Sequence, residues 1–348
     1  MNRTAYHRLT LTLLTLLAMG VMPLAQAQTN ALGLESSLNL LSFGNFVVPS
    51  SDIQGRVAVG GNASIANYSI NTLDGLQAVY GGTGLTVGGN LSYASGSIWG
   101  NTIIGGSLST GQGASFGGSV QIGGDLNTNN NWLGATAISY VGSATGVQQW
   151  QNPAPVQVAA GSVQLGIDFA AEQQRLTTLS QSFDSLANSG VGVNPWGGTF
   201  VFDAHGADLA VFDLASADVA KNLRLDNLGA NTTVILNVHG QTIDFGQHGY
   251  ENFVAGHVLF NLPEATQVTF ASGVFASFLA PLAQFNTPIG GLISGQVVVA
   301  GWNGMGQVND VAFTGNIAAV PEPETYAMML AGLLAIVATT RRRSAVRL

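Results

Sequence analysis

One short pattern recurs four times in the first half of the chain: an apolar or β-branched strand, two glycines and a small polar residue. The four copies read Val57-Ala58-Val59-Gly60-Gly61-Asn62, Leu85-Thr86-Val87-Gly88-Gly89-Asn90, Thr102-Ile103-Ile104-Gly105-Gly106-Ser107 and Val120-Gln121-Ile122-Gly123-Gly124-Asp125. The last three glycine pairs are spaced 17 and 18 residues apart. A fixed period with strands this short predicts a β-solenoid, in which each coil buries an inward apolar row against the next coil.

The glycines and the residues that follow them suggest how the coils turn. We expect glycine where the backbone corners with a positive φ, and Asn or Asp where a residue tolerates that conformation and caps the turn. A set of antiparallel hairpins is the alternative, because Gly-Asn turns also serve hairpins. The regular spacing favours the solenoid.

A single amphipathic helix is predicted after the repeats. The periodicity fades between residues 142 and 166, and Asp168 is a candidate N-cap. Apolar residues then follow at helical spacing: Phe169, Leu176, Leu179, Phe183 and Leu186. We expect a helix over about 168–189, packed along one flank of the solenoid.

Strand-like segments return after this helix and are richer in Phe and Val. We expect strands over residues 199–202, 209–212, 233–238, 257–262, 267–270, 274–279 and 296–300. They predict further coils that close the solenoid after the helix inserts, with residues 304–319 as the exit. The predicted fold class is mostly β: a parallel β-helix with one long α-helix on its flank.

The N-terminus has the pattern of a secretory signal peptide. Arg3 and Arg8 precede an apolar run over residues 9–22, and Ala25 and Ala27 supply the small-x-small cleavage pattern. We therefore predict a signal peptide over residues 1–27, with a helical apolar region, and an exported domain over 28–316.

The C-terminus, residues 317–348, carries three features in fixed order. Pro321-Glu322-Pro323 is followed by fifteen uncharged, mostly apolar residues over 326–340, and then by Arg341-Arg342-Arg343. A helix of that length spans roughly 22 Å, short of the roughly 30 Å hydrocarbon core of a bilayer. The arginines favour the cytoplasmic side. We predict a transmembrane helix over 326–340 and a domain that lies outside the inner membrane.

This tail closely resembles the PEP-CTERM sorting signal of Gram-negative bacteria. The Pro321-Glu322-Pro323 triplet, the apolar run and the Arg341-Arg342-Arg343 cluster match its parts in order. The resemblance implies that an exosortase, an integral-membrane protease, removes the tail near the triplet, and that the protein belongs with extracellular polysaccharide and biofilm matrix. The alternative is a proline linker before an ordinary anchor. Similar tails occur on some ice-binding proteins.

Two blocks of the exported domain resemble the choice-of-anchor A family. The first is the stretch over residues 52–63, Asp-Ile-Gln-Gly-Arg-Val-Ala-Val-Gly-Gly-Asn-Ala, and the second lies over 279–298. Together they bracket roughly residues 32–316. The resemblance implies an adhesin-like surface domain without assigned catalysis.

Charge and composition exclude several classes of partner. Between residues 28 and 320, four basic residues stand against sixteen acidic ones, a net charge of −12. Such a domain repels nucleic acid and anionic lipid and attracts cations. The chain has no cysteine, so disulfides do not stabilise it.

Candidate ligand-binding residues have ordinary structural alternatives. Asp203 and Asp208, with His205, Asp213 and Asp218 nearby, are candidates for calcium ligands, or else turn residues. His239, His248 and His257 are evenly spaced, but we favour strand or turn roles for them over a zinc site. Five tryptophans offer sugar-stacking surfaces, although end-cap or rim positions are favoured: Trp99, Trp132, Trp150, Trp196 and Trp302.

No catalytic motif stands out. The chain lacks G-x-S-x-G and cysteine, and no carboxylate pair has a persuasive context. Arg56 is the candidate for an enzyme groove, against a favoured role as an ion-pair partner of Asp52. We predict no cofactor, no metal and no enzymatic activity.

The sequence thus predicts an exported, structural or adhesive protein of the cell surface or biofilm matrix. Its expected partners are the Sec translocon and signal peptidase, an exosortase, the inner membrane before processing, and exopolysaccharide or a surface protein. Two alternatives stay open: a carbohydrate-active enzyme on a β-helix, and an ice-binding protein, for which no regular Thr-x-Thr array is present.

Overall fold

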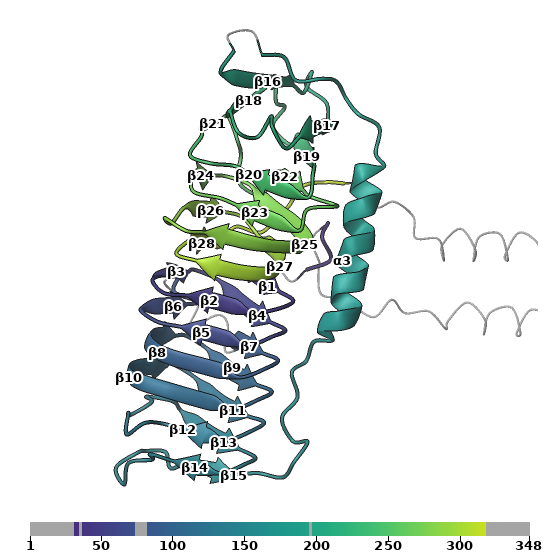
Figure 1. Ribbon diagram of the computed structural model, residues 1–348. Coiled ribbons are helices and arrows are strands. Elements are labelled where there is room, and N and C mark those ends of the chain that lie inside the picture. Colours follow the sequence, from purple (N-terminus) through teal and green to yellow (C-terminus); the bar gives the residue numbers. More distant parts are fainter. Residues whose placement is uncertain (1–30, 35–36, 74–81, 195–196, 318–348) are drawn as a thin grey trace, which may run out of the picture.

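The exported domain is a parallel β-solenoid. The computed structural model describes residues 31–34, 37–73, 82–194 and 197–317. Twenty-five strands form one continuous sheet that winds into stacked coils (Figure 1). The mostly-β solenoid prediction is confirmed. The hairpin alternative is wrong, because the registers between the named strands are all parallel.

Three columns of strands form three faces, here called a, b and c. From the upper end of Figure 1 downward, face a holds β17 (Leu209–Ala215), β19 (Thr233–His239), β22 (Val258–Asn261), β25 (Ser277–Thr287), β27 (Val297–Gly304), β1 (Leu38–Ser42), β4 (Arg56–Val59), β7 (Thr83–Val87), β9 (Asn101–Ile104), β11 (Ser119–Ile122), β13 (Ala137–Tyr140) and β15 (Val156–Gln157). The long strands β25 and β27 continue round the corner into face b.

Face b is completed by shorter strands on both sides of β25 and β27. These are β20 (Thr242–Asp244), β23 (Gln267–Thr269), β2 (Phe46–Val48), β5 (Ala63–Ile65), β8 (Leu91–Ile98), β10 (Leu108–Phe116), β12 (Leu126–Asn127) and β14 (Ala144–Thr145). Face c holds β24 (Gly273–Val274), β26 (Leu292–Ser294), β28 (Gln307–Asn309), β3 (Ser51–Ile53), β6 (Tyr68–Ile70) and the second halves of β8 and β10. A separate sheet at the upper end holds β16 (Thr199–Asp203), β18 (Asn222–Asp226) and β21 (Tyr250–Glu251).

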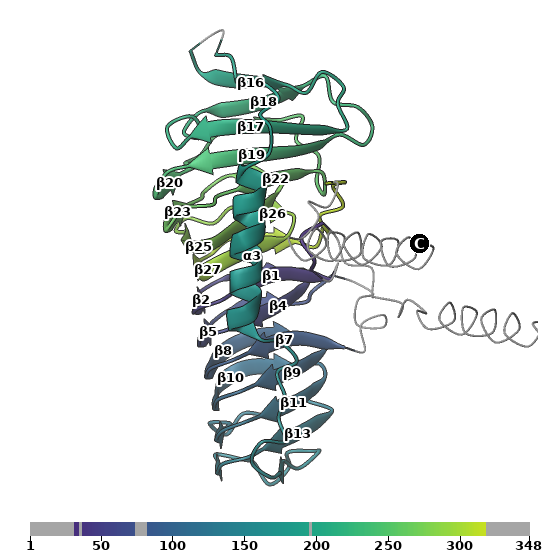
Figure 2. The same cartoon turned by 90° about the vertical axis from the view of Figure 1, so that its right-hand side faces the viewer.

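The chain does not run from one end of the rod to the other. It starts in the middle at β1 and descends to β15. Helix α3 (Phe169–Asp184) then climbs the flank, and the second half descends from the upper end to β28 (Figures 1 and 2). The last coil therefore stacks on the first. The prediction that the later strands close the solenoid after the helix is correct, and the closure lies at mid-rod.

The repeat period in the lower half matches the predicted one. Leu91 is in register with Leu108, and Leu108 with Leu126, which are steps of 17 and 18 residues. The inward residues of successive coils form one core that runs through both halves.

The reason for the paired glycines differs from the expected one. None of the Gly-Gly pairs in the four repeats has a positive φ. They are required by close approach instead: a Cβ on Gly88 would lie 2.4 Å from the carbonyl oxygen of Gly60. A Cβ on Gly89 would lie 2.4 Å from Oδ1 of Asn62. Glycine lets one coil turn directly against the next.

The seam between the two halves is a continuation of the ladder. Leu40 and Leu41 pair with Val297 and Val298, and Phe46 pairs with Trp302. Buried Asn39 joins both sides, because its Nδ2 donates to the carbonyl of Gly295 (2.8 Å) and its Oδ1 accepts from the backbone N–H of Gly55 (3.1 Å). Parallel pairings cross the seam on all three faces, so the two halves form one rod.

Helix α3 packs across this seam on face a and stabilises it. Its buried residues pack in a second apolar cluster with outward residues of strands on both sides: Leu41 and Ala58 below, and Val298, Leu279, Leu259, Ile235 and Val211 above. A polar contact fixes its C-terminal half, since the Oγ of Ser180 donates to Oδ1 of Asn261 (2.6 Å). Face a is therefore covered along the middle of the rod.

The predicted helix is confirmed, with a shorter C-terminal end. Oδ1 of Asp168 accepts from the backbone N–H groups of Ala170 and Ala171 (both 3.1 Å), as expected of an N-cap. The helix ends at Asp184 rather than near 189. Ser189 instead donates its backbone N–H to the carbonyl of Val211 (2.7 Å), so the chain joins the edge of β17.

Two expectations near the C-terminal end of the domain are wrong. Residues 304–319 are not simply an exit, because β28 forms part of the last coil and both Phe313 and Ile317 are buried beside α3. Trp302 is not a rim residue: it is fully buried and stacks on Phe285, with ring centroids 5.2 Å apart and an interplanar angle of 2°. Most aromatic residues of the upper half fill the inside of the solenoid, as Phe245, Phe260 and Phe278 do.

The predicted signal helix and transmembrane helix lie outside the described residues. Within the described part of the chain, no helix is both long and apolar enough to cross a membrane.

Replacing Gly89 with alanine tests the close approach between coils. The new methyl group would also meet the carbonyl oxygen of Gly61 at 2.8 Å. Because overpacking costs about 1–3 kcal/mol, we expect Gly89→Ala to lower the free energy of unfolding by that amount. The loss would be measured as a lower midpoint of urea unfolding. Gly273→Ala is the control, since no atom lies within 4 Å of its added Cβ. Equal losses in both variants would contradict the close-approach explanation.

Truncating Leu176 tests whether the packing of α3 on face a stabilises the rod. The side chain is fully buried between α3 and face a, so Leu176→Ala should lower the free energy of unfolding by about 2–5 kcal/mol. Gln174→Ala lies on the exposed side of the same helix and should change it little. A Leu176→Ala protein as stable as Gln174→Ala in urea unfolding would show that the helix does not support the rod.

Asp310 gives the seam a pH dependence. Its carboxyl group lies near Gly55, Oδ1 is buried without a hydrogen-bond partner, and desolvation raises its pKa to about 6. A folded-state pKa above the unfolded value of about 3.9 means that the folded protein holds this proton more tightly. Stability should therefore fall as the pH rises from about 4 to about 6.

The variant Asp310→Asn removes this titration. Relative to the unmodified protein, its free energy of unfolding should increase between pH 4 and pH 6, measured by urea unfolding at each pH. Parallel pH profiles for the two proteins would rule out Asp310 as the source of the dependence.

Candidate functional site

Face b is a continuous, exposed surface. Its ladder passes without a break through ten strands, in the order β20, β23, β25, β27, β2, β5, β8, β10, β12 and β14. One outward column follows this register: Asp244, Thr269, Asn286, Asn303, Val47, Ser64, Ser92, Ser109, Asn127 and Thr145. Only Asp244 in this column is charged and only Val47 is aliphatic, so the column presents mainly hydroxyl and amide groups.

A second column of polar side chains borders the first, at the turn residues that directly precede strands β2, β5, β8, β10 and β12 of face b. Here the backbone N–H of Asn62 donates to Oδ1 of Asn45 (3.0 Å), and that of Asn90 donates to Oδ1 of Asn62 (2.8 Å). The backbone N–H of Ser107 donates to Oδ1 of Asn90 (2.8 Å), and the backbone N–H of Asp125 donates to Oγ of Ser107 (3.0 Å). We call this column the side-chain ladder. It fixes each amide in one orientation.

Different residue types can occupy a position in the side-chain ladder, provided that the side chain supplies an oxygen that accepts the hydrogen bond. Asp125 occupies one position, and Oδ1 of Asp125 accepts from both the backbone N–H of Ser143 (2.7 Å) and its hydroxyl (2.9 Å). These two hydrogen bonds lower the pKa of the Asp125 carboxyl. An aspartate therefore holds the same geometry as an asparagine here.

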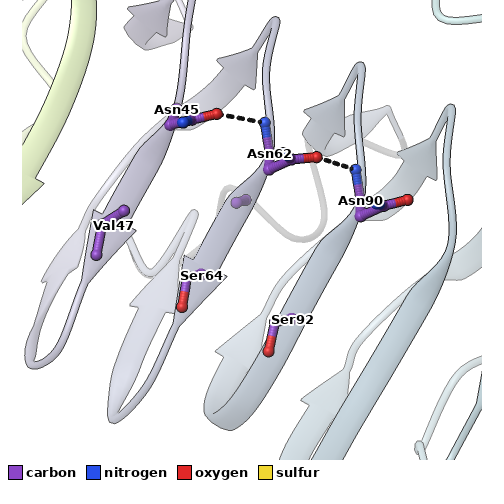
Figure 3. A pocket seen from close by; sticks show the side chains of 7 residues that line it. Asn45, Val47, Asn62, Ser64, Asn90 and Ser92 are labelled. Carbon is purple, nitrogen blue, oxygen red and sulfur yellow. Dashed lines mark hydrogen bonds between the residues drawn. The ribbon is translucent and has the colours of Figure 1, made fainter.

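A shallow depression of about 210 Å³ lies between the two columns, in the coils just below the seam (Figure 3). Six of the side chains around it are labelled in Figure 3: Asn45, Asn62, Asn90, Val47, Ser64 and Ser92. The depression is open to solvent and none of its lining residues is charged or titratable. Its chemistry is hydrogen bonding rather than acid–base catalysis.

The structure separates the candidate calcium residues by role. Oδ2 of Asp203 accepts from Nδ2 of Asn227 (2.8 Å), and Oδ1 accepts from the backbone N–H of His205 (2.7 Å); both bonds lower the pKa of this carboxyl. Asp218 has a turn role, since it accepts from the backbone N–H of Ala215. Among the described residues, no group of three or more His, Asp or Glu is arranged to hold a metal ion. The candidate calcium ligands Asp203 and Asp208 therefore stay candidates only, with turn roles as the alternative.

Among the described residues, the evenly spaced His239, His248 and His257 belong to no group that could hold a metal ion. His239 lies near Asp184 and Asp213, with Nε2 3.6 and 3.9 Å from their carboxylate oxygens, at the end of α3. His205 pairs with Asp203 at the upper end of the rod. These contacts fit structural roles.

Arg56 is a structural residue at the edge of β4. Its guanidinium donates to the carbonyl of Thr83 and to Oγ of Ser37 (3.3 Å), which ties neighbouring segments to β4. Asp52 accepts from the hydroxyl of Thr72 (3.0 Å). Both contacts join adjacent coils.

Trp132 and Trp150 are exposed at 51% and 60%, on the lower coils. Their exposure agrees with the end-cap or rim positions predicted for them.

Sequence reasoning missed the side-chain ladder and the polar columns of face b. A signal was present: a small polar residue follows each glycine pair, and a serine alternates with buried residues in Leu91-Ser92-Tyr93 and Leu108-Ser109-Thr110. The predicted sorting residues lie outside the described part of the chain, as do Ala25 and Ala27.

Comparison with known families identifies two regions. Residues 31–310 match the family described as "Putative Ice-binding-like adhesive domain", and residues 319–343 match the PEP-CTERM protein-sorting motif. The second match contains Pro321, Glu322, Pro323 and Arg341–Arg343. No curated protein and no solved structure matches the chain. The choice-of-anchor A resemblance stays a prediction.

The sorting motif marks an exported protein that an exosortase processes, with a transient C-terminal membrane anchor before its display at the cell surface. Because the adhesive-domain match covers the whole solenoid and most of the chain, the protein belongs to the ice-binding-like adhesive domain family.

Proposed function

We propose that the protein is a non-enzymatic adhesin, displayed at the cell surface or held in the exopolysaccharide of a biofilm, with face b as its contact surface. The observation that carries this proposal is the unbroken register of face b through both halves of the rod. A rigid polar surface that runs the length of the rod suits adhesion to an extended partner better than enclosure of a small one.

The arrangement of the faces supports this assignment. Face a is occupied along its middle by α3 and by the segment that holds Phe313 and Ile317. Face b instead exposes side chains in register, such as Ser64, Ser92 and Ser109. An adhesive family match and a sorting motif on the same chain agree with a surface that is presented outward.

The absence of enzymatic activity is part of the proposal. The depression on face b is lined by amide, hydroxyl and aliphatic groups, none of which titrates near neutral pH. A carbohydrate-active enzyme would need acid–base or nucleophilic groups at that place. The lining of the depression therefore favours binding over hydrolysis or elimination.

We further propose that the chain reaches the surface in two steps. The Sec translocon and signal peptidase would act at Ala25-Gln26-Ala27, and the exosortase near Pro321-Glu322-Pro323. The net charge of −12 on the exported part disfavours adsorption to nucleic acid or anionic lipid, which leaves polysaccharide or a surface protein as the partner.

Processing is tested by intact-mass measurement in cells with and without the exosortase. We expect the protein from exosortase-containing cells to lack the residues after the Pro321–Pro323 region and to fractionate with the matrix or cell surface. Without the enzyme, the full tail should remain and the protein should stay in the inner membrane. A Pro321→Ala, Pro323→Ala double variant should behave as the enzyme-free case.

The same fractionation defines the opposing result. An uncut protein in the inner membrane of both strains would make the tail a plain anchor and would remove the main support for a matrix role. Cleavage without any surface or matrix retention would contradict the adhesive assignment.

A further inference from the structure

The side-chain ladder makes the amides of face b donors towards solvent. In Asn45, Asn62 and Asn90, Oδ1 already accepts the backbone N–H of the next ladder residue (Figure 3). Since this bond occupies the oxygen and all three residues are exposed, the Nδ2 group is the part of each amide that remains available to a ligand. Among the described residues, no acceptor bonds to these three Nδ2 groups. The row therefore presents unsatisfied donors, all in the same orientation.

The surroundings of this row select against charged ligands. Val47, Ser64 and Ser92 line the other side of the depression, and none of its described lining residues is a cation that could compensate an anion. The exported domain as a whole is strongly acidic, which repels polyanions. A ligand must supply hydrogen-bond acceptors without a negative charge. It must also supply hydroxyl groups that can donate hydrogen bonds to the serine hydroxyls and accept hydrogen bonds from them.

The repeat distance selects for a polymer. Neighbouring strands lie about 4.7–4.9 Å apart, so the same pair of groups, an amide donor and a hydroxyl, recurs at that spacing along the rod. A single neutral hydrogen bond at an exposed surface is weak, whereas a chain that meets several coils at once gains from effective concentration. A linear molecule parallel to the rod axis uses this repetition best.

We propose that the amide row of Asn45, Asn62 and Asn90, with the hydroxyls of Ser64 and Ser92, binds a linear, uncharged polysaccharide that lies along the solenoid axis. Sugar hydroxyl and ring oxygens accept hydrogen bonds from the Nδ2 groups, and sugar hydroxyls form hydrogen bonds with the serine hydroxyls. The aliphatic face of a sugar packs on Val47. This proposal names the ligand class of face b and so rests on the proposed adhesive role of that face.

The ladder itself supplies a matched variant. Asn62→Asp with Asn90→Asp keeps an oxygen at the position that accepts the next backbone N–H, as Asp125 does. It replaces each outward donor with a carboxylate oxygen. We expect the double variant to fold normally and to lose at least about tenfold in affinity for a neutral polysaccharide, because two donors are lost and two acceptors gained.

Binding is measured with the purified exported domain, residues 28–317, on immobilised cellulose and mannan as neutral chains and alginate as an acidic one. The charge control is Gln174→Glu with Asn231→Asp, which adds the same charge at exposed positions on α3 and on a loop between β18 and β19. It should bind as the unmodified domain does. Thermal unfolding of each protein confirms the fold.

The expected result is retention on a neutral chain, affinity that rises with the length of soluble oligosaccharide competitors, and loss only in the Asn62→Asp, Asn90→Asp variant. Stronger binding to alginate, equal loss in the charge control, or thermal hysteresis without binding to any polysaccharide would each overturn the proposal. If exosortase-dependent display persists while no polysaccharide binds, the adhesive role stands and the assigned ligand class fails.

Discussion

The close approach of successive coils at the glycine pairs is the constraint on which the rest of the structure depends. Gly89 leaves room for Oδ1 of Asn62, and that oxygen accepts the backbone N–H of Asn90. The same contact thus sets the turn, gives the backbone N–H of Asn90 an acceptor on the neighbouring coil, and orients the amide. Stacking and surface chemistry are therefore not independent: the glycines that allow the coils to stack also determine which atoms face b presents.

The seam imposes a second requirement, because the first and last coils of the chain must recognise each other across about 257 residues of sequence. The ladder between β1 and β27 supplies the register, and Asn39 adds side-chain bonds to the same place. Helix α3 crosses the seam and buries Leu176 and Phe183 in the cluster that includes Leu41 and Val298. This arrangement occupies face a, and the coupling of both halves keeps the columns of face b in one register.

The local features of this fold were predictable, whereas the long-range ones were not. The 17- and 18-residue spacing predicts parallel coils, and Asp168 predicts the start of the helix. The end of the helix was missed because the pairing of Ser189 with Val211 outweighs helix propensity there. The start of the chain at mid-rod was missed because nothing local to Leu40 specifies Val297 as its partner. The ladder was missed because glycine was ascribed to positive φ, although the sequence shows a polar residue after each pair.

The placement of the described chain ends relates the fold to sorting. Leu32 and Leu34, shortly after the predicted signal-peptide site, lie in the same cluster as Phe313 and Ile317, the last buried residues before the sorting motif. Arg175 of α3 also donates to the carbonyl of Leu32 (2.9 Å). Both ends of the domain are therefore held beside α3 on face a, so neither crosses face b. A tether attached at that flank begins on face a, so the point of attachment does not lie among the polar columns of face b.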